Sequence, residues 1–158
     1  MKIKICPVKT LYRLHGEGKT GRCAAVISAS AEVEADRLPG IPYVFLQYDD
    51  VDAPIPGRSF SEADAVRILA FLQKLDSETD AIYCCCDAGQ SRSPAVAAAI
   101  CRRWGQDDSH IWNNPNYAPN MLVFDLLTRA FGLPVSDGEK DALLYTNRKA
   151  FRDAVRNR

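Results

Sequence analysis

The sequence has no excess of either charge, no long apolar run and only two histidines. Its 158 residues carry 20 Lys and Arg against 20 Asp and Glu, so the formal net charge is zero. This balance argues against nucleic acid or a membrane surface as the main partner, because both attract a basic field. No stretch approaches the ~20 apolar residues of a membrane span, and lysines interrupt the apolar start of the chain, so we expect no signal peptide and a cytoplasmic location.

Cysteine pairs at metal-binding spacing are also missing. Three of the six cysteines are consecutive, Cys84, Cys85 and Cys86, but no C-x2-C pair of the kind used for structural zinc exists. The two histidines, His15 and His110, fall in no ligand pattern. In a reducing compartment we expect thiols and no disulfide framework. The sequence therefore predicts no metal and no cofactor, and most of the cysteines are predicted to pack in the core.

The remaining composition is that of an ordinary globular domain, with 47% hydrophobic and 25% charged residues. The length predicts one domain over residues 1–158. Apolar periodicity predicts strands at 2–8, 24–29, 43–48 and 81–86, and helices at 62–76, 93–104, 120–131 and from a Ser136–Glu139 capping box to about 156. Residues 10–22 mix a short element with a loop, and residues 107–119 read as a loop. This order predicts an α/β fold with a central, largely parallel sheet flanked by helices.

The chemistry is concentrated between the predicted 81–86 strand and 93–104 helix. The connecting residues are Cys86-Asp87-Ala88-Gly89-Gln90-Ser91-Arg92-Ser93-Pro94. Backbone N–H groups that converge at a helix N-terminus form an anion site. The same dipoles favour a thiolate at Cys86, which makes it a candidate nucleophile, and Arg92 can hold two phosphate oxygens with its planar fork. Together these groups predict attack on a phosphate monoester.

This loop resembles the signature of the cysteine-dependent protein tyrosine phosphatase superfamily, C-x-x-G-x-x-R-S/T, as Cys86, Gly89, Arg92 and Ser93. Its mid-chain position is most similar to small dual-specificity-like bacterial tyrosine phosphatases, over roughly residues 43–131. The resemblance implies a phosphatase-like fold and an enzyme that hydrolyses phosphate monoesters. The implied substrates are phosphotyrosine proteins or small aryl phosphates, and the implied mechanism needs no cofactor.

The resemblance also implies a role for each residue. Cys86 would attack phosphorus and become a phosphocysteine, Arg92 and the loop amides would stabilise the equatorial oxygens, and Ser93 would donate a hydrogen bond to the departing sulfur. The implied phosphate-binding residues are Asp87, Ala88, Gly89, Gln90, Ser91 and Arg92.

A general acid is expected on a separate loop upstream, where it would be worth about 10²–10⁴-fold in rate. The loop after the predicted 43–48 strand offers Asp49, Asp50 and Asp52. In related sequences the acid precedes a small apolar residue, which favours Asp50 because Val51 follows it. Asp49 and Asp52 stay open as alternatives.

The sequence departs from the family at two positions. Cys85 stands where relatives usually carry a histidine, and this motivates a second hypothesis, a pseudophosphatase that binds phosphate without turning it over. Asp87 brings an acid into a loop that has no lysine, so phosphotyrosine is favoured over a highly anionic inositol phosphate. A third reading, a relative of low-molecular-weight phosphatases or arsenate reductases, is suggested by Arg92-Ser93-Pro94 and the alanines that follow, although in those proteins the loop follows the first strand.

Two further features have alternative readings. Cys84, Cys85 or Cys6 either packs in the core or forms a protective disulfide with Cys86. The asparagine-rich segment 113–120 is either a turn with a helix cap or a wall of the substrate cleft. The oligomeric state is not predicted.

Overall fold

The computed structural model describes residues 1–158, and four strands form a single parallel sheet. The strands are β1 (Lys2–Pro7), β2 (Cys23–Ala29), β3 (Tyr43–Gln47) and β4 (Ala81–Cys86), in the order β1-β4-β2-β3. Every residue of β2 and β4 is buried, as is typical of central strands covered on both faces. The predicted α/β class with a parallel sheet is confirmed.

All four strands end at the same edge of the sheet. Pro7 at the end of β1 is in register with Cys86 at the end of β4, and Ala29 of β2 is in register with Gln47 of β3. The segments that leave these strands therefore meet at one place. In open parallel sheets this carboxyl edge is where ligands bind.

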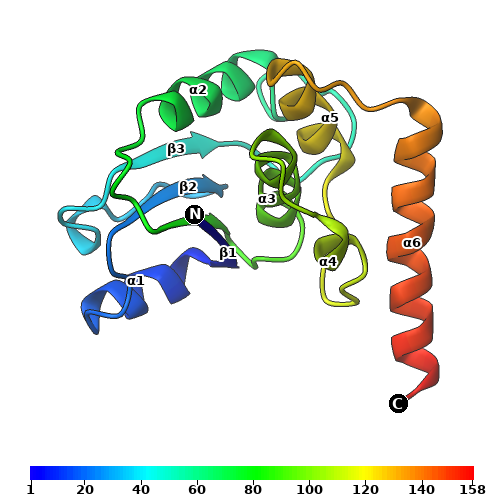
Figure 1. Cartoon of the computed structure of the whole chain (residues 1–158), viewed down its shortest axis with the longest axis horizontal. Coiled ribbons are helices and arrows are strands. Elements are labelled where there is room, and N and C mark those ends of the chain that lie inside the picture. Colours follow the sequence, from blue (N-terminus) through cyan, green and yellow to red (C-terminus); the bar gives the residue numbers. More distant parts are fainter.

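Helices cover both faces of the sheet (Figure 1). Helix α1 (Val8–Gly16) and the short 3-10 helix η1 (Ala35–Arg37) lie on the face that carries Tyr83 and Cys85. Helices α2 (Glu62–Gln73), α3 (Arg92–Arg103) and α5 (Met121–Ala130) lie on the other face. The larger of the two cores is on this second face.

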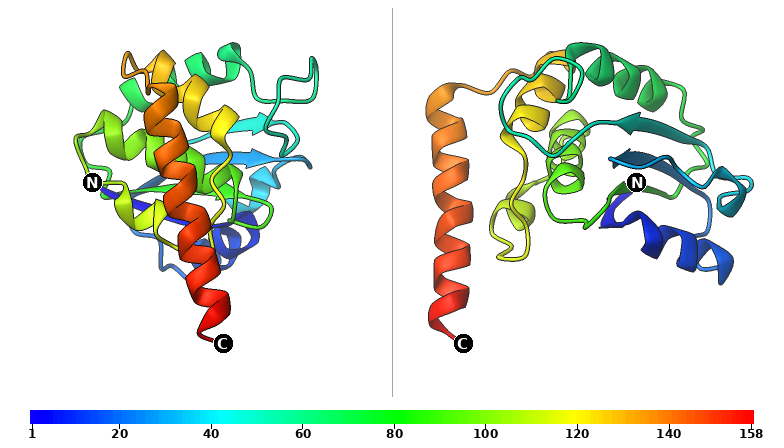
Figure 2. Two further views of the ribbon diagram at one scale, coloured as in Figure 1. Left: turned by 90° about the vertical axis from the view of Figure 1, so that its right-hand side faces the viewer. Right: turned by 180° about the vertical axis from the view of Figure 1, so that it is seen from behind.

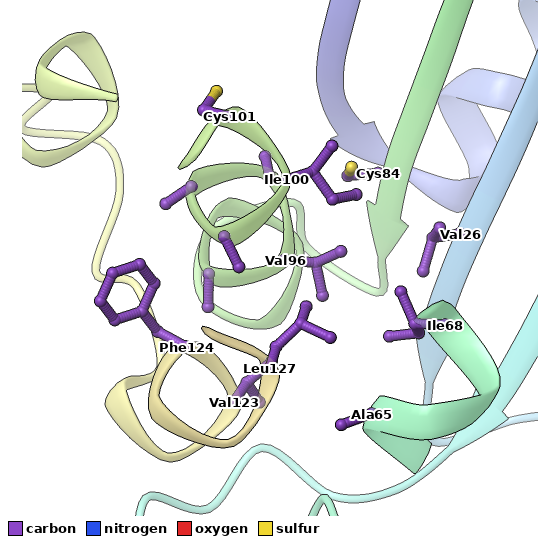
Figure 3. Packing of buried hydrophobic residues seen from close by; sticks show 14 of the residues in the cluster. Val26, Ala65, Ile68, Cys84, Val96, Ile100, Cys101, Val123, Phe124 and Leu127 are labelled. Atoms are coloured by element: carbon purple, nitrogen blue, oxygen red, sulfur yellow. The ribbon is translucent and has the colours of Figure 1, made fainter. Parts of the chain in front are cut away.

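The larger core is organised around α3. Val96 and Ile100 of α3 point toward Cys84 and Val26 of the sheet, while α5 packs on the far side of the helix (Figure 3). All twelve residues of α3 except its last two are buried. Small alanines let neighbouring elements approach closely, so the first turn of α3 is firmly held beside the end of β4.

Helix α6 (Asp137–Arg156) stands at the end of the molecule away from the sheet and lies beside the one-turn helix α4 (Ser109–Trp112) (Figures 1 and 2). Asn147 is its single buried residue, and its amide donates to the carbonyls of Trp112 at 3.2 Å and Tyr117 at 2.8 Å. The helix is thus fixed near its middle by a polar contact. No helix of the protein is long and apolar enough to span a membrane.

The differences from the predicted elements are local. The first strand ends at Pro7 and not at residue 8, because Val8 already begins α1. The short element predicted within 10–22 is the rest of α1, and a loop follows it as predicted. One helical turn, α4, lies within the predicted loop 107–119. The predicted capping box at Ser136 is half-formed: its hydroxyl accepts from the amide of Glu139, but the Glu139 carboxylate accepts from Arg102 at 2.7 Å instead of from the cap. The complete box is at Ser61 and opens α2.

Candidate active site

The thiol of Cys86 lies at the base of the loop that joins β4 to α3. The residue is 2% exposed. Its sulfur accepts a hydrogen bond from the amide of Gly89 at 3.2 Å and lies 3.1 Å from the hydroxyl of Ser93, on the first turn of α3. The sulfur is therefore held by an amide of the loop and by the first turn of α3.

The loop leaves most of its backbone donors free. The amides of Asp87, Ala88, Gln90, Ser91 and Arg92 donate to no group of the protein. The hydroxyl of Ser91, the residue that caps α3, accepts from none of the helix amides. The start of α3 therefore presents uncompensated N–H groups beside the Cys86 sulfur, an arrangement that attracts an anion.

Gly89 is required by the shape of the loop. Its φ is +69°, in the left-handed region that side chains rarely adopt. A Cβ at this position would lie 2.8 Å from the backbone nitrogen of Pro7 and 2.9 Å from the carbonyl carbon of Cys6. The loop thus turns directly against the end of β1, and only glycine permits this approach.

Arg92 is buried, and its guanidinium is held from three strand ends. Nη1 donates to the carbonyl of Tyr48 at 2.8 Å and to the hydroxyl of Ser30 at 3.1 Å, and Nη2 donates to the carboxylate of Asp87 at 2.7 Å. A guanidinium has five N–H donors, so one on Nε and one on Nη2 remain free. Two adjacent donors suit the oxygens of a phosphate.

The ion pair with Arg92 also affects the pKa of Asp87. Partial burial of the carboxyl tends to raise the pKa of Asp87, but the hydrogen bonds from Arg92 and Ser30 outweigh it and hold the pKa below its ordinary value. Asp87 thus stays ionised and fixes the guanidinium in place.

Of the three candidate acids, Asp50 is the one that contacts the loop. One of its carboxylate oxygens accepts from the hydroxyl of Ser91 and from the amide of Asn120, both at 2.9 Å. The Asn120 amide also donates to the carbonyl of Val51 at 3.0 Å. Asp50 is therefore held between the loop that follows Cys86 and the start of α5.

The other two aspartates are arranged differently. Asp49 accepts from Arg58 at 2.9 Å, within its own loop. Asp52 is exposed and lines, together with Asp50, Ser91 and Asn120, a cavity of about 700 Å³. Neither of the two is hydrogen-bonded to the loop that follows Cys86.

The asparagine-rich segment is attached to the loop by its backbone. The amides of Ala118 and Asn120 donate to the carbonyls of Gln90 at 2.8 Å and Ser91 at 3.1 Å. Asn120 also caps α5 through the amide of Val123. The reading of this segment as a turn with a helix cap is confirmed, while its reading as a wall of the substrate cleft stays a prediction.

The cysteines are all free thiols. Cys84 lies in the larger core, and its burial raises the pKa of its thiol. The shortest sulfur contact between two cysteines joins Cys6 and Cys85 at 3.6 Å, and neither sulfur belongs to Cys86. A hydrogen bond from Cys85 lowers the pKa of Cys6 and raises that of Cys85.

Sequence reasoning missed Ser30 and Tyr48, which orient Arg92. Each directly follows a strand, Ser30 after β2 and Tyr48 after β3. The available signal was that residues following parallel strands gather at one edge of the sheet. No group of three or more His, Cys, Asp or Glu side chains is placed to hold a metal ion.

Comparison with known proteins supports this architecture. No family model and no curated protein matches the sequence. Among solved structures, the Cydia pomonella PTP-2 phosphatase superimposes with a TM-score of 0.56 and 17% identity, over 82% of this chain and 85% of that one. Human DUSP28 (TM-score 0.49, 13% identity, 96% and 94% coverage) and Tk-PTP in the active form (0.48, 16%, 93% and 90%) also align. The likeness to the PTP-2 phosphatase shows that the chain shares the fold of that protein, with Cys86 at the end of the central strand β4.

Proposed function

We propose that this protein is a phosphatase that hydrolyses phosphate monoesters, with phosphotyrosine favoured, through a cysteinyl-phosphate intermediate and without a cofactor. One observation carries the proposal. The Cys86 sulfur lies at the base of a loop with five unpartnered amides, beside an arginine with two free N–H donors. A tetrahedral dianion has the charge and the oxygens to accept these hydrogen bonds. We expect the enzyme to act in the cytoplasm on phosphoproteins or small aryl phosphates.

In the first step the thiolate of Cys86 attacks phosphorus, and the bond from phosphorus to the phenolic oxygen breaks. The free amides of residues 87–92 and Arg92 bind the three equatorial oxygens, where charge gathers in the transition state. Asp50 donates a proton to the leaving oxygen. Its contact with Ser91 supports this role, because it holds the carboxyl group beside the loop.

In the second step water attacks the phosphocysteine. Asp50, now a carboxylate, takes a proton from the water, and the bond between phosphorus and sulfur breaks. The Ser93 hydroxyl, 3.1 Å from the sulfur, donates a hydrogen bond to the departing thiolate. Inorganic phosphate leaves and the free thiolate is restored.

A turnover assay with para-nitrophenyl phosphate tests the proposal. We expect activity in the wild type and none in Cys86→Ser. Cys84→Ser is the control and should keep near wild-type activity, because Cys84 is on the same strand but its thiol lies in the larger core. Rapid acid quench of the wild type should reveal one phosphate on Cys86. A wild type without activity, or activity that survives Cys86→Ser, contradicts the proposal.

The second candidate is a pseudophosphatase. The observation that favours it is Cys85, a buried thiol that contacts Cys6 and not the loop that follows Cys86. A protein that binds phosphotyrosine peptide in an Arg92-dependent manner but shows no turnover would be of this kind. The same assay therefore separates the two candidates.

A further inference from the structure

A second cavity lies beside the candidate active site, between residues 115–118 and the C-terminal half of α6. Its volume is about 630 Å³. Arg148, Arg152 and Arg158 line it, together with Phe151, Tyr117 and Gln90, and Gln90 belongs to the loop that follows Cys86. We call this cavity the arginine groove. The part of α6 that forms it projects away from the rest of the protein (Figure 2).

The arginine groove concentrates positive charge in a protein whose formal net charge is zero. No Asp or Glu lines it, and its three arginines form no ion pair. The neighbouring Lys149, by contrast, forms an ion pair with Asp153 at 2.8 Å, one turn further along the helix. Unpaired cations in a concave surface raise the local concentration of anions. The groove therefore fits a negatively charged ligand.

The arginine groove adjoins the cavity that contains Asp50 and Ser91, because the two share Ala118, Asn147 and Arg148. The Ala118 amide donates to the carbonyl of Gln90 at 2.8 Å, so the wall of the groove is attached to the loop that follows Cys86. The hydrogen bonds of Asn147 fix α6 against the opposite wall. The groove is thus preformed.

The dimensions favour an extended peptide over a compact polyanion. Arg148 and Arg158 are separated by ten positions at the end of a helix, which corresponds to roughly 15 Å. An extended peptide covers that length with about five residues. Tyr117 and the exposed ring of Phe151 add apolar surface. This surface can contact the aliphatic parts of peptide side chains, whereas a ligand made only of phosphates has no apolar group to pack there.

We propose that the arginine groove binds an acidic segment of a phosphoprotein substrate that flanks the phosphorylated tyrosine. This inference rests on the proposed function, because it names the substrate that the Cys86 site would receive. The flanking carboxylates pair with Arg148, Arg152 and Arg158 while the phosphate occupies the loop. The interaction adds specificity for acidic sequences and leaves the chemistry at Cys86 unchanged.

Steady-state kinetics with matched phosphotyrosine peptides test it. One peptide has four Glu residues before the phosphotyrosine, a second has four after it, and in a third Gln replaces all of them. We expect kcat/KM for one of the acidic peptides to exceed that of the Gln peptide by about tenfold, from two or three partly exposed ion pairs. The preference should decrease as salt is raised.

The triple variant Arg148→Gln, Arg152→Gln, Arg158→Gln should lose this preference through a higher KM, with kcat unchanged. All three side chains are exposed, so the fold should persist. Lys149→Gln is the matched control: it removes one cation from the same turn outside the groove and should keep the preference.

Para-nitrophenyl phosphate distinguishes a failure of the proposed phosphatase activity from a failure of peptide binding in the arginine groove, because this substrate is too small to reach the groove. No turnover of this substrate contradicts the proposed function itself. Normal turnover with equal kcat/KM for all three peptides, or a preference that survives the triple variant, overturns the inference. A preference of the groove for an inositol polyphosphate over every peptide also overturns it.

Discussion

Asn120 and Asp50 are joined by a hydrogen bond of 2.9 Å between an amide and a carboxylate that are far apart in the sequence. The same asparagine caps α5, and the same carboxylate oxygen accepts from Ser91 in the loop that follows Cys86. The loop after β3, the loop after Cys86 and α5 therefore meet at one carboxylate. Of the three aspartates proposed as the general acid, this relationship favours Asp50.

Asp50→Asn is expected to lower kcat on a phosphotyrosine peptide by about 10²–10⁴-fold, because the amide cannot donate the proton that the phenolate needs. Asp49→Asn and Asp52→Asn are the controls, since neither side chain is hydrogen-bonded to the loop that follows Cys86. A larger loss in either control than in Asp50→Asn would assign the acid elsewhere.

Asn120→Ser separates the two roles of Asn120. Serine is a good N-cap, so the melting temperature should stay within a few degrees of that of the wild type. The amide that positions Asp50 is lost, and we expect kcat to fall about tenfold with little change in KM. Asn120→Ala should lose the cap as well and unfold at a lower temperature. Unchanged kcat in Asn120→Ser would show that the asparagine is only a cap.

Gly89→Ala should destabilise the protein by about 2 kcal/mol or more, since the new Cβ adds a clash with the backbone of Pro7 to an unfavourable φ. Gly132→Ala is the matched control. Its φ of +74° is similar, but nothing lies within 4 Å of the added Cβ, so about 1 kcal/mol is expected. Urea unfolding of both variants measures the difference, and equal losses would contradict the close approach.

Asp87→Asn should change how stability depends on pH. The pKa of Asp87 is lower in the folded protein than its ordinary value, so its ionised form adds stability above the unfolded pKa of about 3.9. This contribution is lost as pH falls through the folded pKa. The wild type should therefore exceed the variant in unfolding free energy near neutral pH, and the gap should close in acid. Urea titrations from neutral to acidic pH check this, and a constant gap would refute the pairing with Arg92.

Cys6 should react with iodoacetamide before the core cysteines at neutral pH. Its thiol is partly exposed, and the hydrogen bond from Cys85 lowers its pKa, whereas burial raises the pKa of Cys23, Cys84 and Cys101. Peptide mapping by mass spectrometry in Cys86→Ser measures the order of labelling. Cys85→Val removes the hydrogen bond and should slow the labelling of Cys6. Faster labelling of a core cysteine would contradict the contact.

Local patterns predicted much of the fold and part of the candidate site. Both β4 and the alanine-rich α3 could be predicted, because burial on both faces selects apolar residues for a strand and a helix repeats its apolar residues periodically. These two elements hold the ends of Cys86-x5-Arg92. The start of α1 was missed because Val8 continues the apolar pattern of β1, and periodicity over so few residues does not separate the two.

The sequence by itself determined the thiol, the arginine and the serine of the loop, since their spacing along one strand–loop–helix unit fixes their relative positions. Only the tertiary structure decided which aspartate meets that loop, which groups hold Arg92 and where the arginine groove lies. Those contacts join Asp50 to Asn120, Arg92 to Ser30 and Tyr48, and α6 to residues 115–118. These contacts depend on parallel strands that end at one edge of the sheet and on the position at which α6 packs. Both bring together residues that are far apart in the sequence, so no local pattern of residues encodes them.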